Sequence, residues 1–174
     1  MGIQFETDYN METLTAMAKS LRKTVRKKRS RRVHIFAAVV LILGLLTILA
    51  TTAAGEPLGA SGVVTLLAML VVILVSLFED KLNAWFARKR LLPGTEHAVA
   101  TFEEDGYVSA TGVTESRFSY AQIVAVAETA RYFVFALSSH HTQAYDKRTI
   151  RGGSVEDFRA FIAEKTGKLV EKIK

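Results

Sequence analysis

Two long runs without a charged Lys, Arg, Asp or Glu constrain this chain more than any other feature of its sequence. Val33–Ala54 has one titratable side chain, His34, at its edge, and Ser61–Phe78 has none. At 1.5 Å per residue, a helix over the first run is roughly 33 Å long, enough to cross a hydrocarbon core of about 30 Å. The remaining residues are too few to cover both runs in a water-soluble core. The runs therefore predict two membrane-spanning helices, over 33–54 and 61–78.

The segment between the two runs predicts a tight turn. Residues 55–60 contain two glycines and one of the chain's two prolines, a composition typical of turns. A cleaved signal peptide is an alternative, because Ala-Thr-Thr-Ala-Ala-Gly before the turn resembles a small-residue cleavage site. The long charged segment before the first run and the second run directly after the turn favour a retained hairpin with an extracytoplasmic turn.

The basic residues are concentrated next to the first run. Residues 1–32 hold nine of the 23 Lys and Arg side chains and three acids, whereas the turn at 55–60 holds no Lys or Arg. Four more basic residues follow the second run within 79–94. Because Lys and Arg stay on the side that is not translocated, both termini are expected in the cytoplasm.

Dense positive charge beside an apolar helix also favours contact with anionic lipid head groups. The alternative is that the block only sets the topology of the hairpin. The candidate lipid or anion contacts in this block are Arg26, Lys27, Lys28, Arg29, Arg31 and Arg32.

The residues before the first run predict a strand followed by a helix. Ile3 and Phe5 lie on one face of an alternating pattern, which is typical of a half-buried strand over residues 1–8. So short a strand needs partners, and we expect it to pair with the sheet at the other end of the chain. Apolar residues at three- and four-residue steps, after a cap at Asn10, predict a basic helix over 10–32 that can continue into the first span.

The residues after the second run predict a small domain. Residues 79–94 are expected to form a juxtamembrane linker, and residues 95–174 a cytoplasmic β domain of about six antiparallel strands. Ser154 caps a closing helix expected over 154–173. The predicted fold class is membrane α+β: a two-helix transmembrane hairpin plus a small antiparallel sheet or partly open barrel, closed by the C-terminal helix.

The order of these segments also resembles a known family. With the stretches Thr-Phe-Glu-Glu-Asp-Gly-Tyr at 101–107, Phe-Ser-Tyr-Ala-Gln-Ile at 118–123 and Ala-Tyr-Asp-Lys-Arg at 144–148, the chain resembles the YcxB-like membrane proteins of bacteria. That family often has Ile-Pro-Lys-Arg before its closing helix, and this chain lacks the proline there. The resemblance implies a pleckstrin-homology-like (PH-like) domain beneath a hairpin in the bacterial cytoplasmic membrane, and it carries over no established activity.

The sequence predicts no catalytic, cofactor-binding or metal-ligating residue. The chain has no Cys, which excludes disulfides and thiolate sites, and the neighbouring His140 and His141 point apart in an extended chain. Nucleic acid is not expected as a partner, because the excess positive charge lies outside the β domain. Lys147, Arg148 and Arg151 are a further basic cluster that could meet lipid phosphates; a solvated strand edge is the alternative.

Two functions are consistent with these features. The first is a non-enzymatic, membrane-anchored protein whose PH-like domain binds a protein partner, a copy of itself or lipid head groups at the bilayer. The alternative is an accessory subunit of a transporter or a small oligomeric membrane channel.

Overall fold

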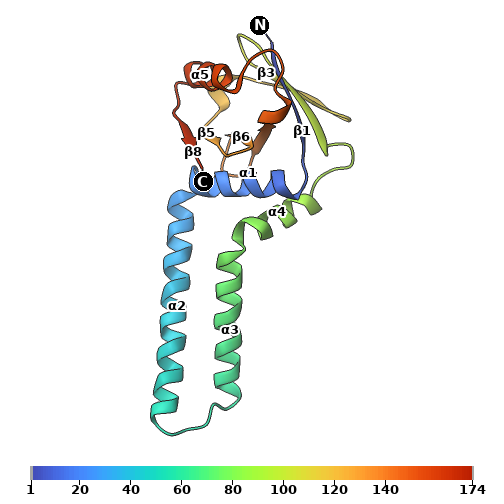
Figure 1. The fold of residues 1–174 in the computed structure, drawn as a ribbon. Coiled ribbons are helices and arrows are strands. Elements are labelled where there is room, and N and C mark those ends of the chain that lie inside the picture. Colours follow the sequence, from blue (N-terminus) through green and yellow to red (C-terminus); the bar gives the residue numbers. More distant parts are fainter. Residues whose placement is uncertain (1, 174) are drawn as a thin grey trace.

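The computed structural model describes residues 2–173, in which a long helical hairpin extends from a small β domain (Figure 1). The hairpin helices are α2 (Lys27–Ala53) and α3 (Ala60–Leu77). Their most apolar stretches have mean hydropathies of 2.7 and 2.6, and no residue of either stretch is buried inside the protein. Both helices are therefore long and apolar enough to cross a membrane.

Small residues let the two hairpin helices approach closely, and hydroxylated residues pair their side chains with the backbone. A Cβ added at Gly44 of α2 would lie 2.8 Å from Sδ of Met69, so the two helices are close at this level. Thr47 and Ser76 donate their hydroxyls to the carbonyls of Leu43 and Val72, one turn earlier, at 2.9 and 2.8 Å. These bonds satisfy the hydroxyls within their own helices, which makes both helices compatible with an apolar surrounding.

The basic segment forms two elements and not the single helix expected over 10–32. Helix α1 (Met11–Lys23) begins after Asn10, whose side chain accepts hydrogen bonds from the backbone N–H groups of Glu12 and Thr13, and it ends before α2 starts at Lys27. Between them the chain bends, and Arg26 N donates to Leu21 O at 2.9 Å. The bend follows from packing, because Leu14 and Leu21 of α1 are buried while α2 leads away along the hairpin (Figure 1).

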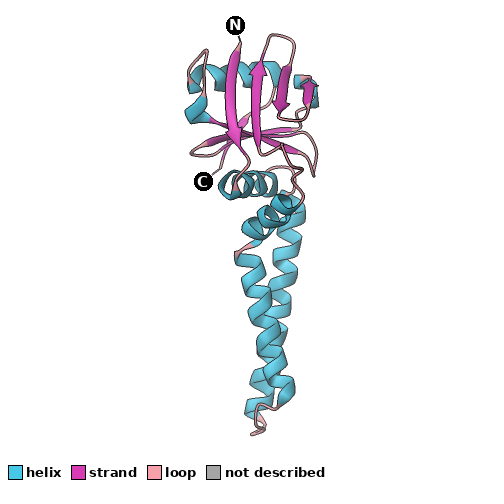
Figure 2. Cartoon of the chain, turned by 90° about the vertical axis from the view of Figure 1, so that its right-hand side faces the viewer, coloured by secondary structure: helices cyan, strands magenta, loops and turns pink. Residues whose placement is uncertain are grey.

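Residues 79–94 are also different from the expected linker. Most of this segment forms α4 (Glu79–Lys89), which lies against α1 and buries Ala84 completely. Two acids in its first turn and two bases in its last turn complement the helix dipole. Figure 2 shows α1 and α4 as a layer between the β domain and the hairpin.

The strands of the described residues form two sheets and no closed barrel. The first sheet has the antiparallel order β1-β2-β3-β4, and the second has the order β7-β6-β5-β8. In the first sheet are β1 (Ile3–Asp8), β2 (His97–Phe102), β3 (Tyr107–Thr111) and β4 (Glu115–Phe118); in the second are β5 (Ala125–Glu128), β6 (Tyr132–Ala136), β7 (Thr142–Asp146) and β8 (Val170–Lys172). Two short 3₁₀ turns, at Tyr120–Gln122 and Lys147–Thr149, follow β4 and β7.

The N-terminal strand β1 pairs with β2 in antiparallel register from Ile3 opposite Phe102 to Asp8 opposite His97. It therefore joins a sheet whose other strands lie on the far side of the hairpin in sequence. A backbone bridge between Gln4 and Arg151 ties β1 to the loop before the last helix.

The closing helix is shorter than the expected 154–173. Helix α5 (Val155–Thr166) begins at Ser154, whose side chain and that of Asp157 form a reciprocal capping box. It ends at Gly167, which has a positive φ of 62° that glycine adopts without steric cost. The following residues form β8, the one parallel strand among residues 2–173, beside β5. Leu169, which lies within the span expected to be helical, is exposed.

One aromatic core joins the two sheets and α5. Phe5 and Phe102 from the first sheet meet Phe133 and Tyr145 from the second, and Phe158 from α5 contacts both sets with ring centroids 4.6–5.0 Å from Phe5, Phe102 and Phe133. The layers are thus held together by edge-to-face rings.

Candidate functional site

The basic block lies where the β domain meets the hairpin. Lys27, Lys28, Arg29, Arg31 and Arg32 are exposed at the beginning of α2. Arg26, just before this helix, donates from Nε to the Ser139 carbonyl at 2.6 Å and from Nη2 to His140 Nδ1 at 2.9 Å. This guanidinium therefore ties the start of the hairpin to the β6–β7 turn.

Helices α1 and α4 are joined by a bidentate ion pair. Arg22 donates from Nε and Nη2 to the two carboxylate oxygens of Asp80, at 2.7 and 2.6 Å. The hydrogen bonds to Asp80 raise the pKa of Arg22 above its ordinary value. Because Asp80 follows α3 by three residues, this pair couples the hairpin to the layer that supports the domain.

The second predicted basic cluster is neutralised by neighbouring acids. Lys147 Nζ lies 3.0 Å from Glu128 Oε1, Arg148 Nη2 lies 3.0 Å from Asp146 Oδ2, and Arg151 Nη2 lies 3.0 Å from Glu6 Oε1. The Lys147 side chain is only 14% exposed. Each of these three residues therefore has an acidic partner, although Glu128 is shared with Arg159 and Asp146 with Arg131. Lys147 has little surface left for a lipid phosphate.

Glu128 is a buried carboxylate held by two cations. Arg159 of α5 donates to both of its oxygens at 2.7 and 2.8 Å, and Lys147 donates at 3.0 Å. These contacts, led by the hydrogen bonds from Arg159, lower the pKa of Glu128 to about 2 against the opposing effect of burial. The group is a permanent anion at neutral pH that fastens α5 to the second sheet.

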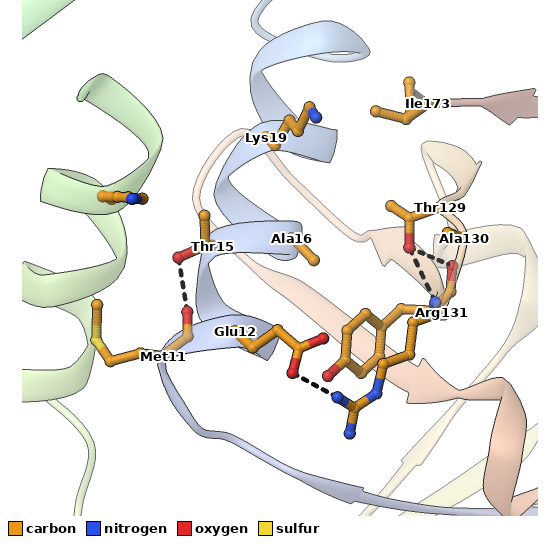
Figure 3. Close-up of a pocket in the computed structure, with 11 residues that line it drawn as sticks. Met11, Glu12, Thr15, Ala16, Lys19, Thr129, Ala130, Arg131 and Ile173 are labelled. Atoms are coloured by element: carbon orange, nitrogen blue, oxygen red, sulfur yellow. Dashed lines mark hydrogen bonds and ion pairs between the residues drawn. The ribbon is translucent and has the colours of Figure 1, made fainter. Parts of the chain in front are cut away.

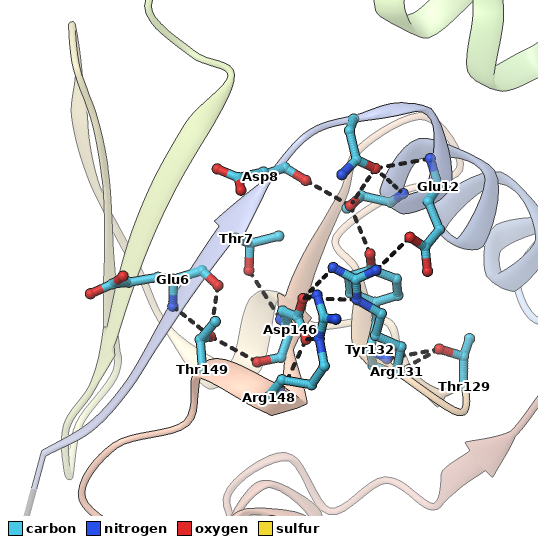
Figure 4. A network of polar contacts seen from close by, with 12 residues as sticks. Glu6, Thr7, Asp8, Glu12, Thr129, Arg131, Tyr132, Asp146, Arg148 and Thr149 are labelled. Atoms are coloured by element: carbon cyan, nitrogen blue, oxygen red, sulfur yellow. Dashed lines mark hydrogen bonds and ion pairs between the residues drawn. The ribbon is translucent and has the colours of Figure 1, made fainter.

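Asp146 is the centre of a polar network that locks the N-terminal strand (Figure 4). Its carboxylate accepts from Arg131 and Arg148, and its backbone N–H donates to Thr7 Oγ1 of β1 at 3.0 Å. Thr149 also holds β1 in place, because its hydroxyl donates to Glu6 O at 2.7 Å and accepts from Glu6 N at 2.9 Å. The network is structural in character, since every member satisfies a neighbour from another element.

The buried tyrosines also have structural partners. Tyr107 and Tyr145 both donate to Gln143 Oε1, at 2.8 and 2.7 Å. Burial raises the pKa of both phenols far above the neutral range. Neither phenol ionises at physiological pH, so the cluster contributes hydrogen bonds to the core.

A groove of about 580 Å³ opens between α1, the β5–β6 turn and Ile173 (Figure 3). Met11, Ala16 and Ile173 supply apolar surface, and Lys19 and Lys81 lie on its lining. Arg131 at its floor is paired with Glu12 and Asp146. The lining thus combines apolar surface with two ammonium groups. No sequence pattern indicated this groove, because its lining residues come from segments that are far apart along the chain.

The two adjacent histidines are separated by their contacts. His140 meets Arg26, while the His141 ring lies 6.2 Å from that of Phe118. Within residues 2–173, no group of three or more His, Cys, Asp or Glu side chains could hold a metal ion.

Comparison with known families gives a match over part of the chain. Residues 102–162 match the family model described as YcxB-like protein, which confirms the resemblance over β3 to β7 and most of α5. No curated protein and no solved structure matches the chain significantly.

Proposed function

We propose, starting from the YcxB-like match of residues 102–162, that this chain is a non-enzymatic membrane anchor for a small PH-like interaction domain. The hairpin spans the cytoplasmic membrane of a bacterium, and the domain lies on the cytoplasmic side. There it binds a protein partner, a second copy or lipid head groups.

The observation that carries this proposal is the attachment of the domain to the hairpin. The chain enters the hairpin from β1 and α1, which are built into and packed against the domain, and leaves it through α4, which packs against α1. Arg22 and Asp80 fasten α1 to α4 directly below the sheets. A domain held this way keeps a fixed height and orientation over the bilayer, unlike a domain on a flexible tether.

The architecture of the domain supports the PH-like assignment. Two small sheets enclose an aromatic core, and α5 covers one end of it. The buried ionic and phenolic groups, such as Glu128 and Tyr145, are engaged with partners inside the fold, which favours a scaffold role for them over chemistry.

The topology can be tested with single cysteines, because the chain has none of its own. Gly59→Cys places a thiol in the turn of the hairpin, where no atom lies within 4 Å of the added Cβ, and Glu115→Cys places one on the exposed strand β4. In intact spheroplasts, a membrane-impermeant maleimide should label the Gly59→Cys variant alone, and permeabilisation should make the Glu115→Cys variant reactive. Labelling of Glu115→Cys in intact spheroplasts would refute the cytoplasmic placement of the domain.

The interaction role can be tested by the mass of the full chain purified in mild detergent from native membranes. We expect the measured mass to show a second copy of the chain, or a soluble partner bound to the domain in a fraction of the molecules. A co-purifying permease, or a large defined oligomer, would instead favour an accessory or channel-forming subunit.

A further inference from the structure

A second cavity, of about 570 Å³, lies at the junction of the hairpin with the domain. Its lining residues come from α1, from the start of α2, from α4 with the adjacent Arg90, and from His140 and Thr142 at the connection between β6 and β7. Four segments that are far apart in the sequence therefore converge on one space.

The lining of this junction cavity carries an excess of positive charge. Four guanidiniums, those of Arg22, Arg26, Arg29 and Arg90, face one carboxylate, that of Glu79. Asp80 already neutralises Arg22. Arg26 has only the uncharged Ser139 carbonyl and the His140 ring as hydrogen-bond partners, and across residues 2–173 neither Arg29 nor Arg90 has a carboxylate within ion-pair distance.

The arginines of the cavity are close enough to disturb one another. Desolvation, and next the charge of Arg29, lower the pKa of Arg26 below its ordinary value, while Glu79 opposes them. An anion placed between Arg26 and Arg29 would relieve both effects, because it compensates the buried charge and screens the repulsion.

The other side of the same cavity is apolar. Leu14 and Leu21 of α1 form part of it, together with Val33 and Phe86, which are 53% and 52% exposed. Val33 is the first residue of the apolar run of α2. The cavity therefore lies at the level where the hairpin passes from charged to hydrocarbon-compatible surface, which is the depth of phospholipid phosphates in a bilayer.

From this combination we infer that the junction cavity binds the phosphate of an anionic phospholipid of the surrounding leaflet. Arg29 and Arg90 hold the phosphate oxygens, Arg26 contributes from the side of the β6–β7 turn, and the apolar wall receives the glycerol and first acyl carbons. Guanidinium groups suit phosphate because their donors form a planar fork. The inference rests on the proposed placement of the hairpin in a membrane, and it adds a defined lipid site to the general attraction of the basic block.

The site can be tested by native mass spectrometry of the full chain in detergent, with phosphatidylglycerol, phosphatidylcholine or inorganic phosphate added. The test variant is Arg29→Gln/Arg90→Gln, whose side chains have no ion pair to lose. The control is Arg31→Gln/Arg88→Gln, which removes the same charge from the same two helices at exposed residues outside the cavity. We expect the wild type to retain one phosphatidylglycerol in preference to phosphatidylcholine, and the test variant to bind it about tenfold more weakly.

Three outcomes would overturn the site. Equal losses of phosphatidylglycerol binding in the test and control variants would show that net charge alone attracts the lipid. Equal retention of phosphatidylcholine would remove the role of the anionic head group, and binding of inorganic phosphate as tight as that of the lipid would remove the role of the apolar wall. Each of these results leaves the cysteine-labelling test of topology unaffected, so failure of the site and failure of the membrane anchor are distinguishable.

Discussion

Glu128 shows how one residue contributes to the stability of a small domain. It lies in the second sheet, is almost fully buried and accepts hydrogen bonds from Arg159 of α5 and from Lys147. Its pKa falls from an ordinary value of 4.5 to about 2, mainly through Arg159. Since the folded-state pKa is depressed, the contribution of Glu128 to stability is full above pH 4.5 and is lost as the pH falls towards 2.

We predict that Glu128→Gln lowers the free energy of unfolding by about 2 kcal/mol at neutral pH, because Arg159 and Lys147 lose a buried counter-charge. The difference from wild type should shrink as the pH falls from 4.5 towards 2, where the wild-type carboxylate becomes protonated. Near-ultraviolet circular dichroism of the full chain in detergent, recorded during thermal unfolding at several pH values, measures both effects. The matched control is Glu171→Gln on the exposed strand β8; equal destabilisation by the two substitutions would contradict the prediction.

Among the elements, α1 and α4 connect the β domain to the hairpin. They pack closely, with Ala84 fully buried and the Arg22–Asp80 pair only 26% and 17% exposed. Because α1 supports the sheets and α4 continues from α3, any loosening between them would uncouple the domain from the hairpin.

We predict that Arg22→Asp loosens α4, because it places two carboxylates where a bidentate pair stood. Adding Asp80→Arg should restore the attraction with the charges exchanged. Hydrogen exchange of the α4 amides, read by mass spectrometry, should be about fivefold faster in Arg22→Asp and return close to the wild-type rate in the double variant. Arg88→Asp, at an exposed residue of α4, is the control; unchanged exchange in Arg22→Asp would show that apolar packing alone holds the layer.

At the scale of the whole molecule, the β domain is assembled from both sides of the hairpin. Phe5 of β1 has no exposed surface and contacts the rings of Phe102, Phe133, Tyr145 and Phe158. Residues 95–174, which read as a separate domain in the sequence, therefore lack a strand and a central core side chain. The helical hairpin is in effect an insertion between α1 and α4.

We predict that Phe5→Ala destabilises the domain by about 3–5 kcal/mol, because it opens a cavity among four aromatic rings. A fragment of residues 95–174 should correspondingly give a poorly dispersed NMR spectrum, and adding a peptide of residues 2–23 should improve the dispersion. Val124→Ala, at a residue that is half exposed, should change the unfolding midpoint of the full chain very little. A well-dispersed spectrum from the fragment alone would show that β1 is dispensable.

Part of this fold follows from short stretches of sequence. The two apolar helices, the alternation that places Ile3 and Phe5 on one face, and the capping of α5 at Ser154 each depend on residues within a few positions of one another. The first turn of α4 carried a comparable signal in Glu79 and Asp80, with bases at its end, although residues 79–94 were expected to form a linker.

The sequence alone determined which segments avoid water and which segments alternate between apolar and polar residues. Each side chain has its own preference for water, and the preference of a segment is the sum over its residues. Only the tertiary structure decided the bend after Lys23, the division of the strands into two sheets, and the turn of the chain at Gly167 into β8. It also decided which cations have a paired acid. The acids that pair with Lys147 and Arg151 are distant in sequence, and no carboxylate among the described residues lies within ion-pair distance of Arg29 or Arg90. Charge compensation and strand pairing depend on distance in space, which the linear pattern does not contain.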